Sequence, residues 1–124
     1  MGDEVPAPSV PMTAAGIAPR VRAVLEAADV EQVSTLLSPN VKWGPPGSST
    51  PPCRTRRQVL AWYAKGRAQG RRATVSEVQV HGNALLVGLR LDDGAERWQI
   101  MRVGEDGVND IRCYDNRPSA QLAL

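Results

Sequence analysis

A carboxylate near the end of the chain is the side chain best suited to acid–base chemistry. Asp115 follows a predicted strand and, if the alternation of that strand continues, lies on the same side as Ile111 and Cys113. A carboxylate buried on that side could serve as a general acid or base, so Asp115 is the candidate catalytic residue. An aspartate that braces the chain where it leaves the strand is the alternative interpretation.

Other charged side chains accompany it in the last two predicted strands, at Arg97, Arg102, Asp110 and Arg112. Carboxylates and guanidinium groups on neighbouring strands could hold a water molecule or a substrate. Opposite charges at such positions also commonly pair on a solvated or dimer-facing surface. Both interpretations remain open.

The aromatic residues are few, so their positions are informative. Large amphipathic rings can form the wall of an apolar cavity, and ordinary core or dimer-interface packing explains them equally well. The candidate ligand-binding residues are these rings and the neighbouring side chains expected to face the cavity: Trp43, Trp62, Tyr63, Trp98, Gln99, Met101 and Cys113.

A basic cluster surrounds the start of a predicted helix at residue 55. Arg54 and Arg57, together with free backbone N–H groups, suit a carboxylate or phosphate and are candidates for binding an anionic head group. Solvated arginine on a surface is the alternative. The cluster extends to Arg72, but no groove-reading motif accompanies it and the net charge is only +2, which makes nucleic acid an unlikely partner.

Metal and disulfide frameworks are poorly supported. Cys53 and Cys113 are sixty positions apart, and the chain has one histidine. We expect two free thiols, no metal and no cofactor.

Composition indicates one small globular domain. The chain has 124 residues, of which 42% are hydrophobic, and no apolar run approaches the ~20 residues needed to span a bilayer. The acidic, proline-rich start lacks the features of a secretory signal. We therefore expect a cytoplasmic protein without a membrane partner, with a disordered tail over residues 1–16, one domain over 17–118 and a C-terminal tail over 119–124.

Hydrophobic periodicity changes from helical to alternating at about residue 70. Apolar residues at spacings of three and four predict helices over residues 17–28, 30–37 and 55–68. A short strand is expected over 41–43, and the Gly/Pro-rich segment 44–52 is a loop and a candidate cavity rim. Alternating segments between 75 and 114 predict a three- or four-stranded antiparallel meander. This order indicates an α+β fold with the helices packed on the sheet.

Two segments carry a resemblance to a known family. AADVEQVSTLLSPNVKW (residues 27–43) and GVNDIRCYDNR (residues 107–117) resemble the opening and the last strand of the nuclear transport factor two-like superfamily, which includes SnoaL-like polyketide cyclases and ketosteroid isomerase. The resemblance covers roughly residues 19–117. It implies a curved antiparallel sheet wrapped around the helices as a cone, an internal cavity for a small molecule, and a homodimer through the other face of the sheet.

The resemblance also implies specific catalytic positions. Steroid isomerases of this superfamily use a tyrosine, a carboxylate base and a protonated acid, and these positions carry Val21, Gly44 and Gln99 here. Without the base that mechanism is rejected, although Gln99 could still donate a hydrogen bond to a ligand. The hydrolase branch uses an Asp-Arg-Asp arrangement, for which the charged residues above are candidates.

Two functions remain as expectations, because fold alone cannot choose between them. The first is binding of a small, partly apolar ligand, with or without an anionic group, together with isomerase, cyclase or hydrolase-type acid–base chemistry. The second is a catalytically silent, dimeric accessory or interaction domain.

Overall fold

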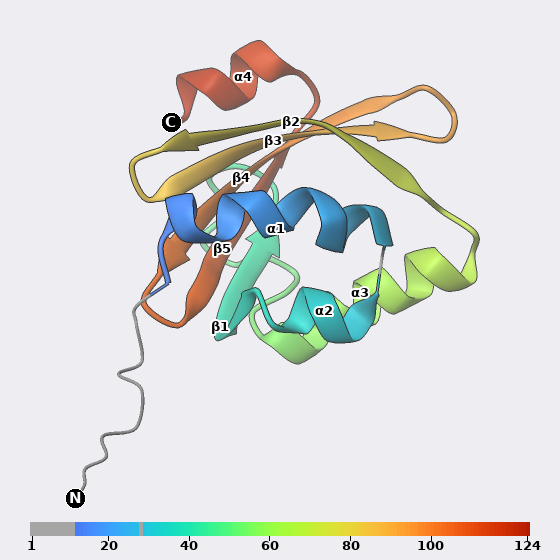
Figure 1. The fold of residues 1–124 in the computed structure, drawn as a ribbon, viewed down its shortest axis with the longest axis horizontal. Helices are drawn as coiled ribbons and strands as arrows, with labels where there is room; N and C mark the ends of the chain where they lie inside the picture. Colours follow the sequence, from blue (N-terminus) through green and yellow to red (C-terminus); the bar gives the residue numbers. More distant parts are fainter. Residues whose placement is uncertain (1–11, 28) are drawn as a thin grey trace, which may run out of the picture.

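Helices cover both faces of a single five-stranded sheet in the computed structural model, which describes residues 12–27 and 29–124. Helices α1 (Ala14–Ala27), α2 (Val30–Ser34) and α3 (Arg56–Ala68) lie on one side, here called the inner face, and α4 (Arg117–Leu122) lies on the other (Figure 1). The α+β prediction is confirmed. Most of the predicted N-terminal tail, residues 1–11, lies outside the described residues.

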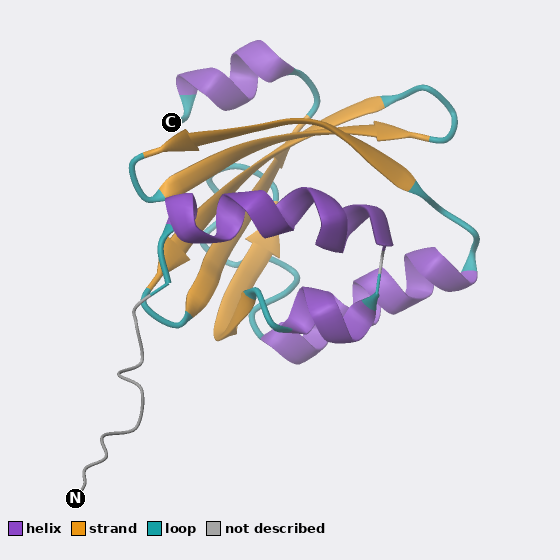
Figure 2. Ribbon diagram, in the orientation of Figure 1, coloured by secondary structure: helices purple, strands orange, loops and turns teal. Residues whose placement is uncertain are grey.

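The sheet is mixed rather than purely antiparallel. Its strands are β1 (Leu37–Gly44), β2 (Ala73–His81), β3 (Ala84–Leu91), β4 (Glu96–Gly104) and β5 (Gly107–Tyr114), in the order β1-β5-β4-β3-β2. Strands β2 to β5 form the predicted antiparallel meander. Strand β1 pairs in parallel with β5, so the first and last strands in the chain are neighbours (Figure 2). Sequence patterning did not predict that pairing.

Strand β1 is longer, and helix α2 shorter, than predicted. The prediction for residues 30–37 was wrong at its end, because the backbone N–H groups of Thr35 and Leu36 bond to carbonyls three residues back and tighten the last turn. Leu36 then accepts a hydrogen bond from the backbone of Val108 at 2.8 Å. Pairing with β5 therefore takes Leu37 into the sheet. Pro39 is tolerated because β1 is an edge strand.

Helix α3 begins and ends where its signals predicted. The Thr55 side chain accepts a hydrogen bond from the backbone of Gln58, which caps the helix, and Gly70 adopts φ +76° just after its end. One side of α3 packs on β1 and presents Val59, Leu60 and Tyr63 to the inner-face core. This packing places the exposed Trp62 beside the end of β1.

The main core lies between the inner face and the helices. Val21 of α1, Val41 of β1, Leu85 of β3 and Ile111 of β5 are at most 1% exposed, and they belong to one contiguous cluster. Met101 of β4 is part of the same cluster. This core fixes the relative positions of the strand ends that carry the candidate site.

Helix α4 covers the other, outer face of the sheet, where the sequence analysis had placed a C-terminal tail from residue 119. Its fully buried Ala120 packs on an apolar cluster formed by Ala84, Leu86, Trp98 and Ile100. Arg117 pairs with Glu77 at 2.8 Å and lies 5.7 Å from the centre of the Trp98 ring. A homodimer through the outer face of the sheet stays a prediction. Such a dimer would have to use the part of this face that α4 leaves uncovered, or displace the helix.

The ion pair between Glu77 and Arg117 makes the attachment of α4 dependent on pH. Hydrogen bonds from Arg117 lower the pKa of Glu77 in the folded protein. The pair therefore stabilises the fold above the pKa that Glu77 has in the unfolded chain, about 4.3, and this contribution is lost as the pH falls through the lower folded value. We expect the wild type to melt at a higher temperature than Glu77→Gln at pH 7, and the difference to shrink progressively as the pH falls from about 5 to 3.

Thermal unfolding followed by circular dichroism between pH 7 and pH 3 tests this expectation. Glu105→Gln, at an exposed residue after β4, is the control. Its melting temperature should stay close to that of the wild type at every pH. A difference in melting temperature between the wild type and Glu77→Gln that stays constant down to pH 3 would contradict the expectation.

Within residues 12–27 and 29–124, no helix combines the length and the apolar character needed to cross a membrane.

Candidate ligand pocket

An apolar pocket opens at the end of β1, between α3 and the end of β5. Its volume is about 200 Å³, on the order of seven water molecules at ~30 Å³ each, so it suits a compact ligand. The residues that line it come from β1, the following loop, α3 and β5: Trp43, Gly44, Pro52, Cys53, Trp62 and Cys113.

Two aromatic rings belong to the wall, those of Trp43 and Trp62. Trp43 stacks on Tyr63, with ring centres 5.5 Å apart and planes at 28°. Trp62 meets the edge of Trp43 at 6.4 Å and is 50% exposed, so it forms the outer wall of the pocket. Lys65 lies 5.5 Å from the centre of the Trp62 ring. A flat ligand could pack against Trp43 and Trp62 with geometry that aromatic pairs favour.

Two thiols face the pocket, and both carry a proton at neutral pH. Burial raises the pKa of Cys53, partly opposed by a hydrogen bond from Trp62. Burial also raises the pKa of Cys113, although hydrogen bonds from Trp43 and Gln99 oppose the rise. The indole Nε1 of Trp43 donates to the Cys113 sulfur at 2.9 Å. The thiols therefore behave as neutral, weakly polar wall groups.

A buried amide lies next to Cys113. Gln99 of β4 stands opposite Cys113 in the sheet, is 5% exposed, and donates from Nε2 to the Cys113 sulfur at 3.7 Å. Its Oε1 is buried without a hydrogen-bond partner among the described residues. Buried polar atoms are almost always paired, so this oxygen is a marked exception in the structure.

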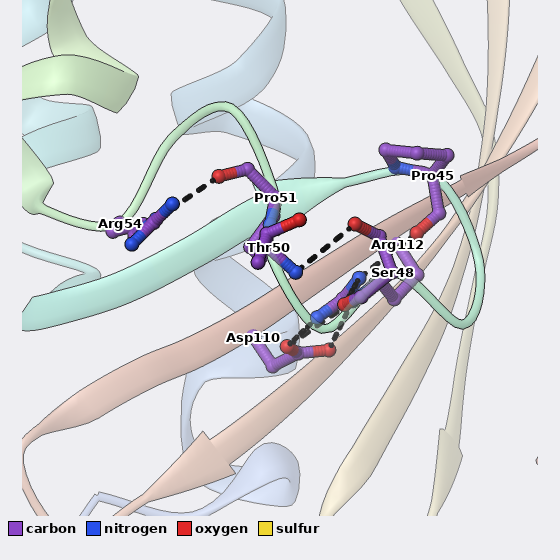
Figure 3. Close-up of polar contacts among 7 residues, drawn as sticks. All are labelled: Pro45, Ser48, Thr50, Pro51, Arg54, Asp110 and Arg112. Carbon is purple, nitrogen blue, oxygen red and sulfur yellow. Dashed lines mark hydrogen bonds and ion pairs between the residues drawn. The ribbon is translucent and has the colours of Figure 1, made fainter.

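The loop after β1, residues 45–52, reaches the pocket at Pro52 and is here called the rim loop, since its length made it a candidate rim in the sequence. Arg112 holds this rim loop by donating to the backbone oxygens of Pro45 and Ser48 at 2.8 and 2.9 Å (Figure 3). Asp110, two residues earlier on the same strand, pairs with Arg112 at 3.0 Å. Their role is therefore to anchor a loop, whereas the sequence analysis considered cross-strand pairs or a water-activating site.

The rim loop also approaches β1 closely. A Cβ atom on Gly44 would lie 2.8 Å from the side chain of Pro51 and 2.9 Å from that of Pro52. Glycine at position 44 thus allows the proline ring of residue 52 to reach the pocket wall. This position is also the one that the family resemblance assigns to a carboxylate base.

The predicted ligand-binding residues separate into three groups. Trp43, Trp62 and Cys113 line the pocket, and Tyr63 and Gln99 contact that lining directly. Met101 belongs to the core, and Trp98 lies on the outer face under α4. The rings of Trp43 and Trp98 thus lie on opposite faces of the sheet, so no single cavity wall contains both.

Arg54 and Arg57 are exposed and do not line the pocket. The backbone N–H of Arg54 donates to the Gln58 side chain, and its guanidinium donates to the Pro51 carbonyl at 3.4 Å (Figure 3). Arg54 therefore contacts its own loop and helix rather than the pocket.

Asp115 does not occupy the buried position that the catalytic hypothesis required. Strand β5 ends at Tyr114, and Asn116 caps α4, so the strand alternation stops before residue 115. Asp115 is exposed and lines a neighbouring surface hollow of about 370 Å³ together with Tyr114 and Asn116. The alternative interpretation, an aspartate that braces the chain where it leaves the strand, stays a prediction.

Sequence reasoning missed Cys53 and Pro52 as wall residues. Cys53 reaches the pocket because its backbone forms an isolated antiparallel bridge with Trp43, through hydrogen bonds of 2.9 and 3.3 Å. No periodic pattern marks a single bridge within a loop. The described part of the chain contains no group of three or more His, Cys, Asp or Glu side chains placed to hold a metal ion.

Comparisons with known proteins show the fold. No protein-family model matches the sequence, and no curated protein matches it. The structure is similar to that of an NTF2-like protein of unknown function from Cytophaga hutchinsonii, with a TM-score of 0.66 and 10% identity over 90% of this chain and 96% of the other.

Two further solved structures are similar. One is a SnoaL-like protein of unknown function from Burkholderia thailandensis, with a TM-score of 0.68 and 14% identity over 86% of this chain and 99% of the other. The other is an LEH-like epoxide hydrolase from M. tuberculosis, with a TM-score of 0.61 and 18% identity over 83% and 82% of the two chains. At these identities the likeness concerns the fold alone.

Proposed function

We propose that this chain, which has the nuclear transport factor two-like fold, binds a compact, flat and neutral small molecule in the pocket between Trp43 and Trp62. The observation that carries the proposal is the wall itself, in which two indoles, a proline ring and two protonated thiols enclose about 200 Å³. Such a wall favours apolar surface with few polar groups.

The character of the pocket argues for a neutral ligand. Arg54 and Arg57, which suggested an anionic head group, are exposed and stand outside the wall. Placing a charge against the indoles and protonated thiols would cost solvation without a paired opposite charge. Acid–base chemistry at Asp115 has less support than binding, because that side chain is exposed.

Nuclear magnetic resonance of the three tryptophan indole N–H groups tests the proposal. Quinoline, a flat bicyclic molecule, serves as the probe. We expect the signals of Trp43 and Trp62 to shift and saturate with a dissociation constant near 1 mM, which corresponds to ~4.1 kcal/mol, or about 0.4 kcal/mol for each non-hydrogen atom of quinoline. Trp98, on the outer face, is an internal control whose signal should not move.

Substitution of Trp62 provides the matching variant. Trp62→Ala removes the outer wall while leaving the core intact, because this side chain is half exposed, and we expect at least fivefold weaker quinoline binding. Leu122→Ala, at an 89% exposed residue of α4, should bind as the wild type does. Absence of any saturable shift, or equal shifts of all three indoles, would refute binding at this pocket.

A further inference from the structure

We propose that Gln99 selects ligands whose head group carries an N–H or O–H donor beside a carbonyl acceptor, as in a lactam or a carboxamide. This inference rests on the proposed function, because the body of the ligand would occupy the same pocket. It adds a specificity-determining residue and a chemical class of ligand.

The hydrogen-bonding state of Gln99 supports this assignment. Oε1 is buried and unpaired among the described residues, and Nε2 has only the sulfur of Cys113, at 3.7 Å. A primary amide can accept two hydrogen bonds at its oxygen and donate two from its nitrogen. A lactam would provide hydrogen-bond partners for both ends of this amide, since the lactam N–H would donate to Oε1 and the lactam carbonyl would accept from Nε2.

Burial makes this pairing selective. Gln99 is 5% exposed, so water competes poorly for its amide, and hydrogen bonds strengthen where the local dielectric is low. A ligand that fills the pocket without a donor would leave Oε1 unpaired. Sites with buried polar groups discriminate strongly against analogues that fail to satisfy them.

Cys113 links the amide to the pocket. It lines the pocket, Gln99 does not, and its sulfur accepts hydrogen bonds from Trp43 and Gln99. The cysteine side chain is small and turns about one torsion, so a change of rotamer would open a path from the pocket to the amide. Removing the thiol should therefore help a lactam to reach Gln99.

Three probes that share a bicyclic body test the inference. These are 2-quinolone, with a lactam N–H beside its carbonyl; N-methyl-2-quinolone, which keeps the carbonyl; and quinoline, which has neither group. Titration calorimetry on the full chain should give at least tenfold tighter binding of 2-quinolone than of its N-methyl analogue. Cys113→Ala should tighten the binding of 2-quinolone more than that of quinoline, because only the lactam can use the amide that the smaller side chain uncovers.

Gln99→Leu, which replaces the amide by an apolar side chain, should bind both quinolones alike, whereas Gln32→Leu at an exposed residue should keep the wild-type preference. Equal binding of 2-quinolone and its N-methyl analogue by the wild type would overturn the inference, as would a preference retained in Gln99→Leu. Failure of all three probes to bind would instead refute the proposed function. The comparison of probes on the wild type decides the matter even if Gln99→Leu folds poorly.

Discussion

Trp43→Ala is expected to abolish binding in the pocket and to lower the free energy of unfolding by about 3 kcal/mol. The indole stacks on Tyr63, meets Trp62 edge-on, and donates its N–H to Cys113. Alanine would remove all three contacts together and leave a cavity that joins the pocket to the core. The expected cost is at the lower end of the range for tryptophan truncation because Trp43 is only half-buried.

Urea unfolding monitored by circular dichroism measures this effect, and the indole shifts of Trp62 report ligand binding. Trp62→Ala is the matched control, because it removes the same side chain from the other side of the pocket, where it is 50% exposed. We expect it to weaken binding at a cost of less than about 1 kcal/mol in stability. Similar losses of stability in the two variants would show that Trp43 has no special packing role.

Gly107→Ala is expected to destabilise the fold by about 3 kcal/mol or more. Gly107 has φ +126°, which an alanine adopts only with strain. A Cβ atom there would also lie 2.7 Å from the carbonyl oxygen of Leu36 and 3.0 Å from the backbone of Leu37 and Ser38. These are backbone atoms at the start of β1, so relief of the clash would separate the parallel pair β1 and β5.

Gly94→Ala is the matched control for backbone strain. Gly94 also has positive φ, +85°, but a Cβ atom there would meet nothing within 4 Å. We expect it to cost about 1 kcal/mol, the conformational penalty alone. Chemical unfolding of both variants separates the cost of backbone strain from the cost of the clash with β1. Equal decreases in the free energy of unfolding would mean that the clash between residue 107 and β1 contributes little.

Local signals predicted most of the secondary structure because each depends on near neighbours in the sequence. The Thr55 cap and the positive φ of Gly70 delimit α3, and alternating apolar residues gave the meander β2 to β5. The prediction failed at Leu37, where helical spacing and strand pairing competed. The hydrogen bond between Val108 and Leu36 joins segments about seventy residues apart, which local periodicity cannot report.

The candidate site was predictable in composition but not in arrangement. Trp43, Trp62, Tyr63, Gln99 and Cys113 were expected together and do lie together, whereas Trp98 lies on the outer face. Gln99 precedes Ile100 and follows Trp98, so neighbouring residues of β4 point to opposite faces. The alternation was visible in the sequence, but the face that the three inner helices cover was not.

The sequence by itself determined the α+β class, the capped helix α3 and the antiparallel meander, since these depend on periodicity, caps and turn residues that act locally. Only the tertiary structure decided that β1 joins β5, that α4 covers Trp98, that Asp115 is exposed, and that the buried oxygen of Gln99 has no partner among the described residues. Those features depend on contacts between residues far apart in the chain, where burial and hydrogen-bond pairing are settled by packing rather than by local pattern.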